Sequence, residues 1–375
     1  MDIFKFGNPN APLQMESAEV IEGFTSKLWI ERYRDAGEFT LTAPVGTDLI
    51  TKLPIGSFIS HADSTDIMIV ENHEINESES AMAEIKITGR SFETILGNRI
   101  VGDNRTFPIS AAVKDCIMAT DYTWNQIYLL LLNHTLLAYQ LDPNNEIPNL
   151  SILTSIYGIG DAIAAQRTIP RKSLYDATLE LLAIDNLGIR AIRPGPTYPA
   201  LPVGNTAIVI HNGHDKTGSV VFAWDSGEIA SADYLWSNKA LKNAALISGK
   251  WVEVLVVSTS YTKANRRMMF IDGTSFDSDQ TVAPTGATFT TIAGYMTQRA
   301  SDILAAQTDV EIAKVEVFKG ISGTAGHPKY RTDYILGDLV TVKGNYNTKS
   351  KFIVTEYVEV DDGTNVSGYP TLTLP

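Results

Sequence analysis

Two histidines, His211 and His214, form the closest pair of imidazoles in the sequence, and Asp215 follows directly. Imidazole and carboxylate groups bind zinc, but a zinc site needs three or four such ligands, at a spacing such as His-Glu-x-x-His. The two intervening residues are Asn212 and Gly213, a strong signal for a two-residue hairpin turn. We therefore predict a turn with the two imidazoles at its flanks, and no metal site.

Three aspartates, Asp272, Asp277 and Asp279, lie in one polar loop. A calcium-binding EF-hand loop has oxygen ligands at its first, third and fifth positions. Counted from Asp272, the third and fifth positions hold Thr274 and Phe276, so the pattern fails. The sequence predicts a solvated loop rather than a cation site.

Glutamates are dense at positions 71, 74, 77 and 79, where they could supply paired catalytic carboxylates. The acid and the nucleophile of a glycosidase face each other across a cleft at a defined separation. These glutamates instead lie on and around the tip of one predicted hairpin. We interpret them as a solvated acidic edge, and the pair Asp361 and Asp362, with the nearby Glu356 and Glu359, in the same way.

A nucleophilic enzyme has little support either. The single cysteine, Cys116, lies in an apolar helical pattern, which predicts a small buried residue rather than a nucleophile. With no second cysteine, the fold does not depend on an internal disulfide. The Gly-x-Ser-x-Gly motif, the Walker phosphate loop and the Cys-x-x-Cys pair are absent from the sequence. We predict no enzyme, no cofactor and no metal.

The acidic tip belongs to a hairpin that runs directly into a short helix. Along the returning strand, Ala83, Ile85 and Ile87 share one face, which is the alternation of a half-buried strand. Gly89 ends that strand, and Ser91 is placed to cap the helix that follows. This hairpin and helix form the centre of the first part of the chain.

An earlier pair of strands precedes the hairpin, over residues 26–34 and 38–43. In the first of them, Trp29 and Tyr33 share one face. Gly37 lies in the turn between the two strands, where glycine is free to adopt a positive φ. These strands and the hairpin predict a β-rich beginning.

Changes in the pattern divide the chain into four parts, and the predicted fold class is β-rich α+β. The parts are a first β-rich domain (1–105), a helical insertion with the entry to a second domain (106–195), a β-rich middle region with one helix (196–308) and closing strands (309–375). Pro194, Gly195 and Pro196 form the best boundary signal in the chain.

The charge balance of the 375 residues is acidic, with a formal net charge of −13 and a pI of about 4.9. Sequence-independent nucleic-acid binders need a basic surface, so this class is disfavoured, and so is an anionic membrane surface as partner. The most apolar run, residues 127–137, is shorter than the ~20 residues that cross a bilayer. With no visible signal peptide, we expect a soluble protein, made in a cytoplasm, that does not insert into membranes.

Four segments resemble, in order, one known family. They are Ser26-Lys-Leu-Trp-Ile-Glu-Arg-Tyr-Arg-Asp-Ala-Gly-Glu-Phe-Thr-Leu-Thr-Ala-Pro44; Lys86-Ile-Thr-Gly-Arg-Ser-Phe-Glu-Thr-Ile-Leu-Gly-Asn-Arg-Ile100; Tyr175-Asp-Ala-Thr-Leu-Glu-Leu-Leu-Ala183 with Leu187-Gly-Ile-Arg190; and Asp333-Tyr-Ile-Leu-Gly-Asp-Leu-Val-Thr-Val342 with Val354-Thr-Glu-Tyr-Val358. Together they resemble the siphophage tail hub, or baseplate hub, family. It includes ReqiPepy-type siphovirus tail proteins and the N-terminal hub part of tail-associated lysins. Residues 205–308 match this family least.

The resemblance implies a structural virion protein at the distal end of the phage tail. In this family each subunit has two small barrel-like tube domains, and a homotrimer presents a pseudo-sixfold ring to the tail tube. The partners it implies are the tail tube or a distal tail protein on one side and a fibre or receptor-binding protein on the other. Genomic DNA passes through the ring without specific binding.

The resemblance also gives several residues an expected role. Gly37, Gly89 and Gly337 are expected to fix backbone geometry, and Glu71, Glu77 and Glu79 to form an acidic edge that faces the lumen or an interface. Lysin-type relatives continue into hydrolase or fibre domains, which this sequence lacks, so cell-wall degradation is not expected.

Two other classes of function stay open on the sequence alone. A carbohydrate- or receptor-binding module of the tail tip would need a cluster of exposed aromatic residues, such as Trp224, Trp236 and Trp251. A hydrolase would need titratable groups that converge in a cleft, and no motif in the sequence supplies them.

Overall fold

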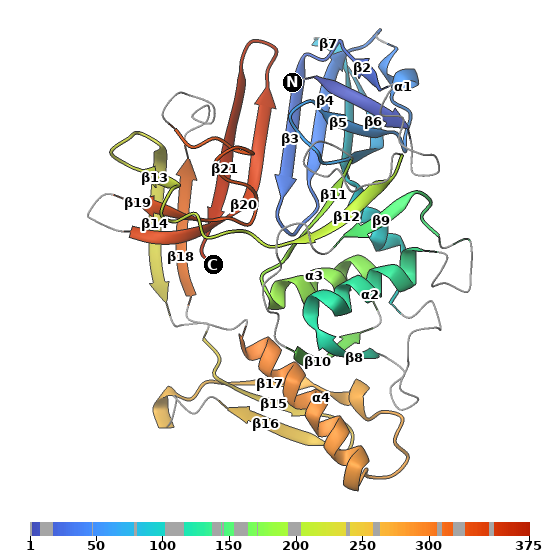
Figure 1. Cartoon of the computed structure of the whole chain (residues 1–375), viewed down its shortest axis with the longest axis vertical. Coiled ribbons are helices and arrows are strands. Elements are labelled where there is room, and N and C mark those ends of the chain that lie inside the picture. Colours follow the sequence, from blue (N-terminus) through green and yellow to red (C-terminus); the bar gives the residue numbers. More distant parts are fainter. Residues whose placement is uncertain are drawn as a thin grey trace.

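The computed structural model describes residues 2–7, 18–46, 48–78, 81–101, 116–136, 144, 146–153, 164–170, 172–193, 204–237, 241–257, 263–305, 310–317, 327–344 and 349–375. Strands dominate these residues, and a few helices pack against them (Figure 1). The predicted β-rich α+β class is therefore confirmed. None of the described helices is long and apolar enough to cross a lipid bilayer.

The first part of the chain forms a strand-rich body that we call the N-lobe. Its elements are β1 (Ile3–Gly7), β2 (Glu19–Ile21), β3 (Ser26–Arg32), β4 (Glu38–Pro44), α1 (Leu49–Lys52), β5 (Phe58–His61), β6 (Met68–Ser78), β7 (Ala81–Ser91) and the 3-10 helix η1 (Phe92–Asn98). The strands follow the order β3-β4-β7-β6-β5-β1-β2. The predicted alternation is confirmed, because Ile85 and Ile87 are buried while Glu84 is exposed.

The last part of the chain forms a second strand-rich body, the C-lobe. Its strands are β13 (Val221–Ala223), β14 (Ile229–Ser237), β18 (Val310–Val317), β19 (Leu339–Lys343), β20 (Lys349–Asp361) and β21 (Val366–Thr373). They follow the order β14-β18-β21-β20, with β19 beside β20 and β13 beside β19. Buried aromatic and branched residues, among them Phe222, Tyr334 and Phe352, form a core separate from that of the N-lobe.

One backbone ladder joins the two lobes. Strand β20 pairs antiparallel with β3, so that Val358 lies opposite Ile30 and Glu359 opposite Trp29. Figure 1 shows these two strands side by side although more than 300 positions separate them in the sequence. The result is one 13-stranded sheet that runs through both lobes.

Two helices and two small sheets lie between the lobes in sequence. They are β8 (Cys116–Tyr122), α2 (Thr123–Thr135), β9 (Leu150–Leu153), β10 (Ala164–Pro170), α3 (Leu174–Ile184), β11 (Gly188–Ile192) and β12 (Thr206–His211). The nearly all-apolar helix α2 is enclosed by the fold itself, since Ile127, Leu130 and Leu131 join the largest core. Ser173 caps α3 by accepting a hydrogen bond from the backbone N–H of Asp176.

Among the described residues of the predicted helical insertion, some that were predicted to be helical form a strand. Strands β8 and β10 pair with each other over seven positions, from Cys116 opposite Pro170 to Tyr122 opposite Ala164. Cys116 was predicted in a helix, and its placement at the start of a strand corrects that prediction. The remainder of the predicted helix, at 109–115, lies outside the described residues.

A small α/β unit, which we call the insert, lies between β14 and β18 in sequence. It contains β15 (Ala244–Ser248), β16 (Glu253–Val257), η4 (Lys263–Asn265), β17 (Met268–Asp272), η5 (Thr274–Phe276) and α4 (Gly286–Ala305). Figure 1 shows α4 lying across one face of the sheet β16-β15-β17, at the end of the molecule away from the N-lobe. The apolar side of α4 buries Ile292, Met296 and Ala300 against this sheet.

Asn212 and Gly213 do not form the predicted hairpin turn. Strand β12 pairs with β11 and β9, whereas β13 pairs with β19 in the large sheet, so the strands on either side of the dipeptide belong to different sheets. Gly213 instead passes so close to Gly337 that a Cβ atom at position 213 would overlap the carbonyl group of Gly337. The backbone at Gly213 therefore packs directly against the backbone at Gly337.

The three glycines singled out from the sequence all lie in tight places. A Cβ atom at Gly37 would overlap the carbonyl oxygen of Ile30, and one at Gly89 would overlap that of Ile69. Gly337 combines a positive φ of 90° with close contact to the ring of Tyr33. Gly37 is not among the positive-φ residues, so close approach, and not the predicted left-handed backbone, explains its small side chain.

Alanine substitutions at Gly89 and Gly294 test whether close approach of the backbone requires glycine. The two expected changes in the free energy of unfolding have opposite signs. Gly89→Ala should lower the free energy of unfolding by about 3 kcal/mol, because the added methyl group must displace backbone of β6. Gly294→Ala, in α4 with open space around it, should raise it by about 0.5–1 kcal/mol. Urea unfolding of both variants measures the difference, and equal effects would contradict the assignment of Gly89.

Candidate functional site

Buried and half-buried ionisable side chains lie together where the N-lobe, β11 and the C-lobe meet. We call this group the junction cluster. It consists of Glu31, His61, Asp66, Arg190, Arg331 and Glu359. Charged groups are rarely buried unless they are paired, so each member needs an identified partner.

Glu31, on β3, lies at the centre of the cluster and is 1% exposed. One carboxylate oxygen accepts hydrogen bonds from Arg331 at 2.8 Å and Trp29 Nε1 at 3.2 Å, and it also contacts the hydroxyl of Ser64. The other oxygen accepts from the hydroxyl of Tyr330 at 2.7 Å. Both oxygens of this buried carboxylate are therefore satisfied by protein donors.

Two arginines connect Glu31 to the other carboxylates. Arg190 donates to Asp66 Oδ1 from Nε at 2.9 Å and from a terminal nitrogen at 2.5 Å, and lies 3.6 Å from Glu31. Arg331 donates to Glu359 at 2.9 Å in addition to Glu31. Four parts of the chain that are distant in sequence are thus linked through one set of charges. The prediction that Glu359 and Asp361 are solvated is therefore wrong, since Asp361 is also buried and paired with Lys27 at 3.0 Å.

The electrostatics of the cluster follow from this pairing. Although burial by itself raises the pKa of Glu31, the guanidinium groups of Arg331 and Arg190 hold that pKa well below its ordinary value. Burial raises the pKa of Asp66 to about 6, against the attraction of Arg190. Glu31 therefore stays ionised at neutral pH and is fully engaged by donors. The cluster joins parts of the fold that are distant in sequence.

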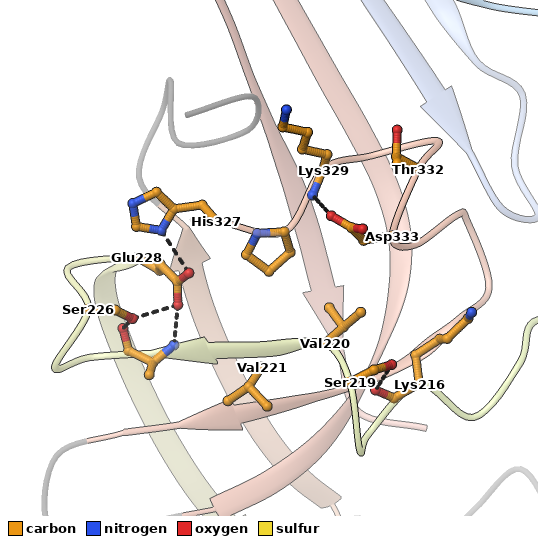
Figure 2. A pocket seen from close by; sticks show the side chains of 12 residues that line it. Lys216, Ser219, Val220, Val221, Ser226, Glu228, His327, Lys329, Thr332 and Asp333 are labelled. Atoms are coloured by element: carbon orange, nitrogen blue, oxygen red, sulfur yellow. Dashed lines mark hydrogen bonds and ion pairs between the residues drawn. The ribbon is translucent and has the colours of Figure 1, made fainter. Parts of the chain in front are cut away.

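A second polar site lies in an open groove of the C-lobe of about 950 Å³. Figure 2 shows Glu228 at its floor, where the carboxylate accepts hydrogen bonds from the Ala223 N–H at 2.7 Å, Ser226 Oγ at 2.7 Å and His327 Nδ1 at 2.9 Å. A catalytic serine must instead donate its proton to an imidazole. Ser226 donates to the carboxylate, so the arrangement of Ser226, His327 and Glu228 is not that of a catalytic triad.

The glutamates predicted to form the acidic edge have different surroundings, and one of them is paired with an arginine. Glu71 on β6 is bound by Arg90 on β7 through two hydrogen bonds of 2.8 Å. Glu77, near the end of β6, is exposed. Glu79 lies outside the described residues. The role of these glutamates, like that of the three glycines, stays a prediction.

His211 and His214 contact different neighbours. His211 is buried, with the edge of its ring against Tyr33 at a centroid distance of 5.3 Å, and burial lowers its pKa to about 3. His214 lies 3.5 Å from the carboxylate of Asp338. Among the described residues, no three His, Cys, Asp or Glu side chains are grouped so that they could hold a metal ion.

Asp277 corrects the prediction of a solvated loop. Its carboxylate is buried and accepts three backbone hydrogen bonds, from Lys250 at 2.7 Å, Trp251 at 2.6 Å and Val252 at 2.8 Å. This side chain therefore fixes the turn that connects β15 to β16. A carboxylate with this structural task looks the same in sequence as a solvated one.

Glu31 and Glu93 were not recognised from the sequence. By strand alternation Glu31 shares the inward face of β3 with Trp29 and Tyr33, and that is the signal that could have identified it. Burial raises the pKa of Glu93 to about 8, so this side chain is mostly protonated at neutral pH. Ser91 contacts it and also accepts a hydrogen bond from the Gly37 N–H, in place of the predicted helix cap.

One known protein family matches nearly the whole chain. The profile of the family described as Siphovirus ReqiPepy6 Gp37-like protein matches residues 13–369. The chain belongs to this family. The resemblance drawn from four ordered segments is thereby confirmed, and it extends across nearly the entire sequence. Among curated protein sequences, none matches this one.

Solved structures of tail proteins share the fold of this Gp37-like protein. A tail protein from Neisseria meningitidis MC58 aligns with a TM-score of 0.55 at 10% identity, covering 99% of this chain and 96% of the other. The 43 kDa tail protein of prophage MuSo2 from Shewanella oneidensis aligns with a TM-score of 0.54 at 12% identity, covering 100% and 98%. The chain therefore belongs to the Gp37-like siphovirus family and has a fold that these tail proteins share.

A neutral substitution at the centre of the junction cluster tests its part in this Gp37-like protein. Glu31→Gln should lower the free energy of unfolding by about 3–5 kcal/mol, because it leaves Arg190 and Arg331 buried with one anion fewer. Glu38→Gln is the matched control on the neighbouring strand, since Glu38 is bound to Arg32 at 2.8 Å but is half-exposed. There the expected loss is at most about 1 kcal/mol.

Urea unfolding at neutral pH gives both values. Equal losses for the two variants would contradict a special role for Glu31. A native-like stability of Glu31→Gln would show that the two lobes are held together by the backbone ladder alone.

Proposed function

We propose that this protein is the structural hub of the tail tip or baseplate, at the distal end of the virion tail. Three copies form a ring that joins the tail tube, or a distal tail protein, to fibres or receptor-binding proteins. DNA passes through the ring on ejection. The role is structural and not enzymatic.

The observation that supports this proposal best is the fixed pairing of two strand-rich lobes within one chain. The β3–β20 ladder and the junction cluster hold the two cores in one orientation. Three copies of a rigid two-lobed chain present six strand-rich bodies, which suits a partner with six subunits. A protein that transmits force between tail parts also needs lobes that do not move apart.

Open strand edges support the formation of a ring. Strands β14 and β2 lie at opposite ends of the 13-stranded sheet, and neither has an outer neighbour among the described residues. Open edges are places where another chain can add, and head-to-tail contacts between unlike surfaces generate closed rings. The ring is thus a way to cover edges that a monomer leaves open.

Mass measurement of the purified full chain, combined with electron microscopy, tests the proposed ring. The expected result is a particle of three subunits with a central channel. A monomer at all concentrations, together with the absence of a threefold ring of this protein in intact virions, would overturn the proposal.

The acidic edge is proposed to face the channel, where like charge keeps the DNA phosphates from binding. Glu77 is the described glutamate best suited to a test, because Glu71 is already neutralised by Arg90. Glu77→Lys should slow DNA ejection from assembled particles, and Glu71→Lys and Glu79→Lys should act in the same direction. Asp225→Lys makes the same charge change at an exposed turn of the C-lobe and should leave ejection unchanged. Equal rates for all variants would exclude a channel position.

The glycan-binding alternative loses support from the positions of its aromatic residues. Trp224 follows β13 in the C-lobe and is only partly exposed, whereas Trp251 lies in the insert on a different sheet. The side chain of Trp236 is outside the described part. Trp224 and Trp251 therefore do not belong to one aromatic surface.

A further inference from the structure

The sheet of the insert has one covered face and one open face. Residues Ala245, Ile247, Val254, Val256, Met269 and Ile271 face α4 and form the core of the insert. Cross-strand register places the residues between them on the opposite face. None of the described residues forms a layer over that face, where the large apolar side chains are exposed.

The open face carries two apolar rows across three strands. In one row Leu255, Leu246 and Phe270 lie side by side, and in the next Val257, Ala244 and Met268. Phe270 is 65% exposed, Leu255 50% and Met268 49%. Apolar side chains gathered in this way on one surface mark an interaction site, whereas single exposed ones do not.

The charges at the two ends of these rows have opposite signs. The row after Leu255 and Phe270 contains Glu253 and Asp272, both exposed. Beyond Met268 the same alternation continues to Lys242, whose ammonium donates to the Met268 carbonyl, and to the exposed Arg266. Along the strands the face is therefore acidic, apolar and basic in turn.

We propose that this open face binds the same face of a second copy of this chain. With the two sheets face to face and their strands reversed, each acidic end lies over the basic end of the other copy. The two apolar rows then cover each other at the usual sheet-to-sheet spacing of about 10 Å. In a twofold, isologous contact the same surface of both copies meets, so that surface must be complementary to itself. The order acidic, apolar and basic meets this requirement.

The contact is small, because it involves three short strands, whereas a stable interface buries about 800 Å² on each partner. We therefore expect weak association of free chains and firm contact where other interactions hold copies together. A ring is built from head-to-tail contacts, so this twofold contact goes beyond the proposed ring and links copies from two separate rings or precedes ring formation.

Sedimentation of the full chain across a wide concentration range tests the proposal. The native protein should show association that grows with concentration, beyond any ring. Phe270→Glu should weaken this association at least tenfold, because it buries a carboxylate in the apolar rows. Phe289→Glu is the matched control, since Phe289 is also exposed in the insert but lies on α4. It should leave association unchanged.

A charge exchange within one chain distinguishes a second copy from any other occupant. Glu253→Lys should weaken association, and adding Lys242→Glu should restore it, because only a self-complementary contact regains opposite charges on both sides. Association that is insensitive to Phe270→Glu, or a double variant that is not restored, would overturn the proposal. So would a Phe270→Glu protein that self-associates normally but fails to enter virions, since another tail protein would then occupy the face.

The twofold contact and the proposed ring can be refuted independently of each other. Phe270→Glu is expected to leave threefold particles intact, so their loss would identify the face as a ring contact and refute the twofold one. A chain that dimerises through this face but never forms a threefold particle would refute the ring alone.

Discussion

The rest of the structure depends on the buried carboxylate of Glu31. A charge without water needs donors at both oxygens. These come from β3 itself, from the segment that precedes β6, and from residues 330 and 331, which are 299 and 300 positions later. Buried ion pairs contribute little net stability compared with apolar residues, but breaking one is costly. Glu31 therefore acts mainly by penalising every arrangement in which Arg190 and Arg331 are not both in place. It specifies how the lobes meet.

This constraint explains how one chain tolerates large insertions. Between β7 and β13 it forms two helices and two small sheets, and between β14 and β18 it forms the insert. Both insertions begin and end at strands of the large sheet, and the β3–β20 ladder and the junction cluster hold the two lobes of that sheet together. Both oxygens of Glu31 are occupied by protein donors, so this group of ionisable side chains joins parts of the fold. The chemistry available to partners lies on surfaces.

Local sequence patterns predicted what depends on local contacts. The alternation of Ile85 and Ile87 holds in the structure because a strand face is set within a few residues. Predictions failed where distant partners decide. Asn212-Gly213 is diverted from a hairpin because β12 and β13 find partners in different sheets, and Asp277 is buried by three N–H groups some 25 positions away. Glu31 was visible only as an acid on an apolar face, and nothing local names Arg331 as its partner.

The same reasoning explains why the surfaces of this protein carry more functional information than its interior. Among the residues that the structure describes, β14 and β2 have no outer neighbour in the large sheet, and exposed edges invite pairing with another chain. On the insert, Phe270 and Leu255 are exposed on either side of Leu246, while α4 covers the opposite face of the same sheet. Both features lower the solubility of a free chain and become favourable once a neighbour covers them. Rigidity at the junction would let contacts made at one surface fix the positions of the others, which suits the proposed role as a subunit of a ring.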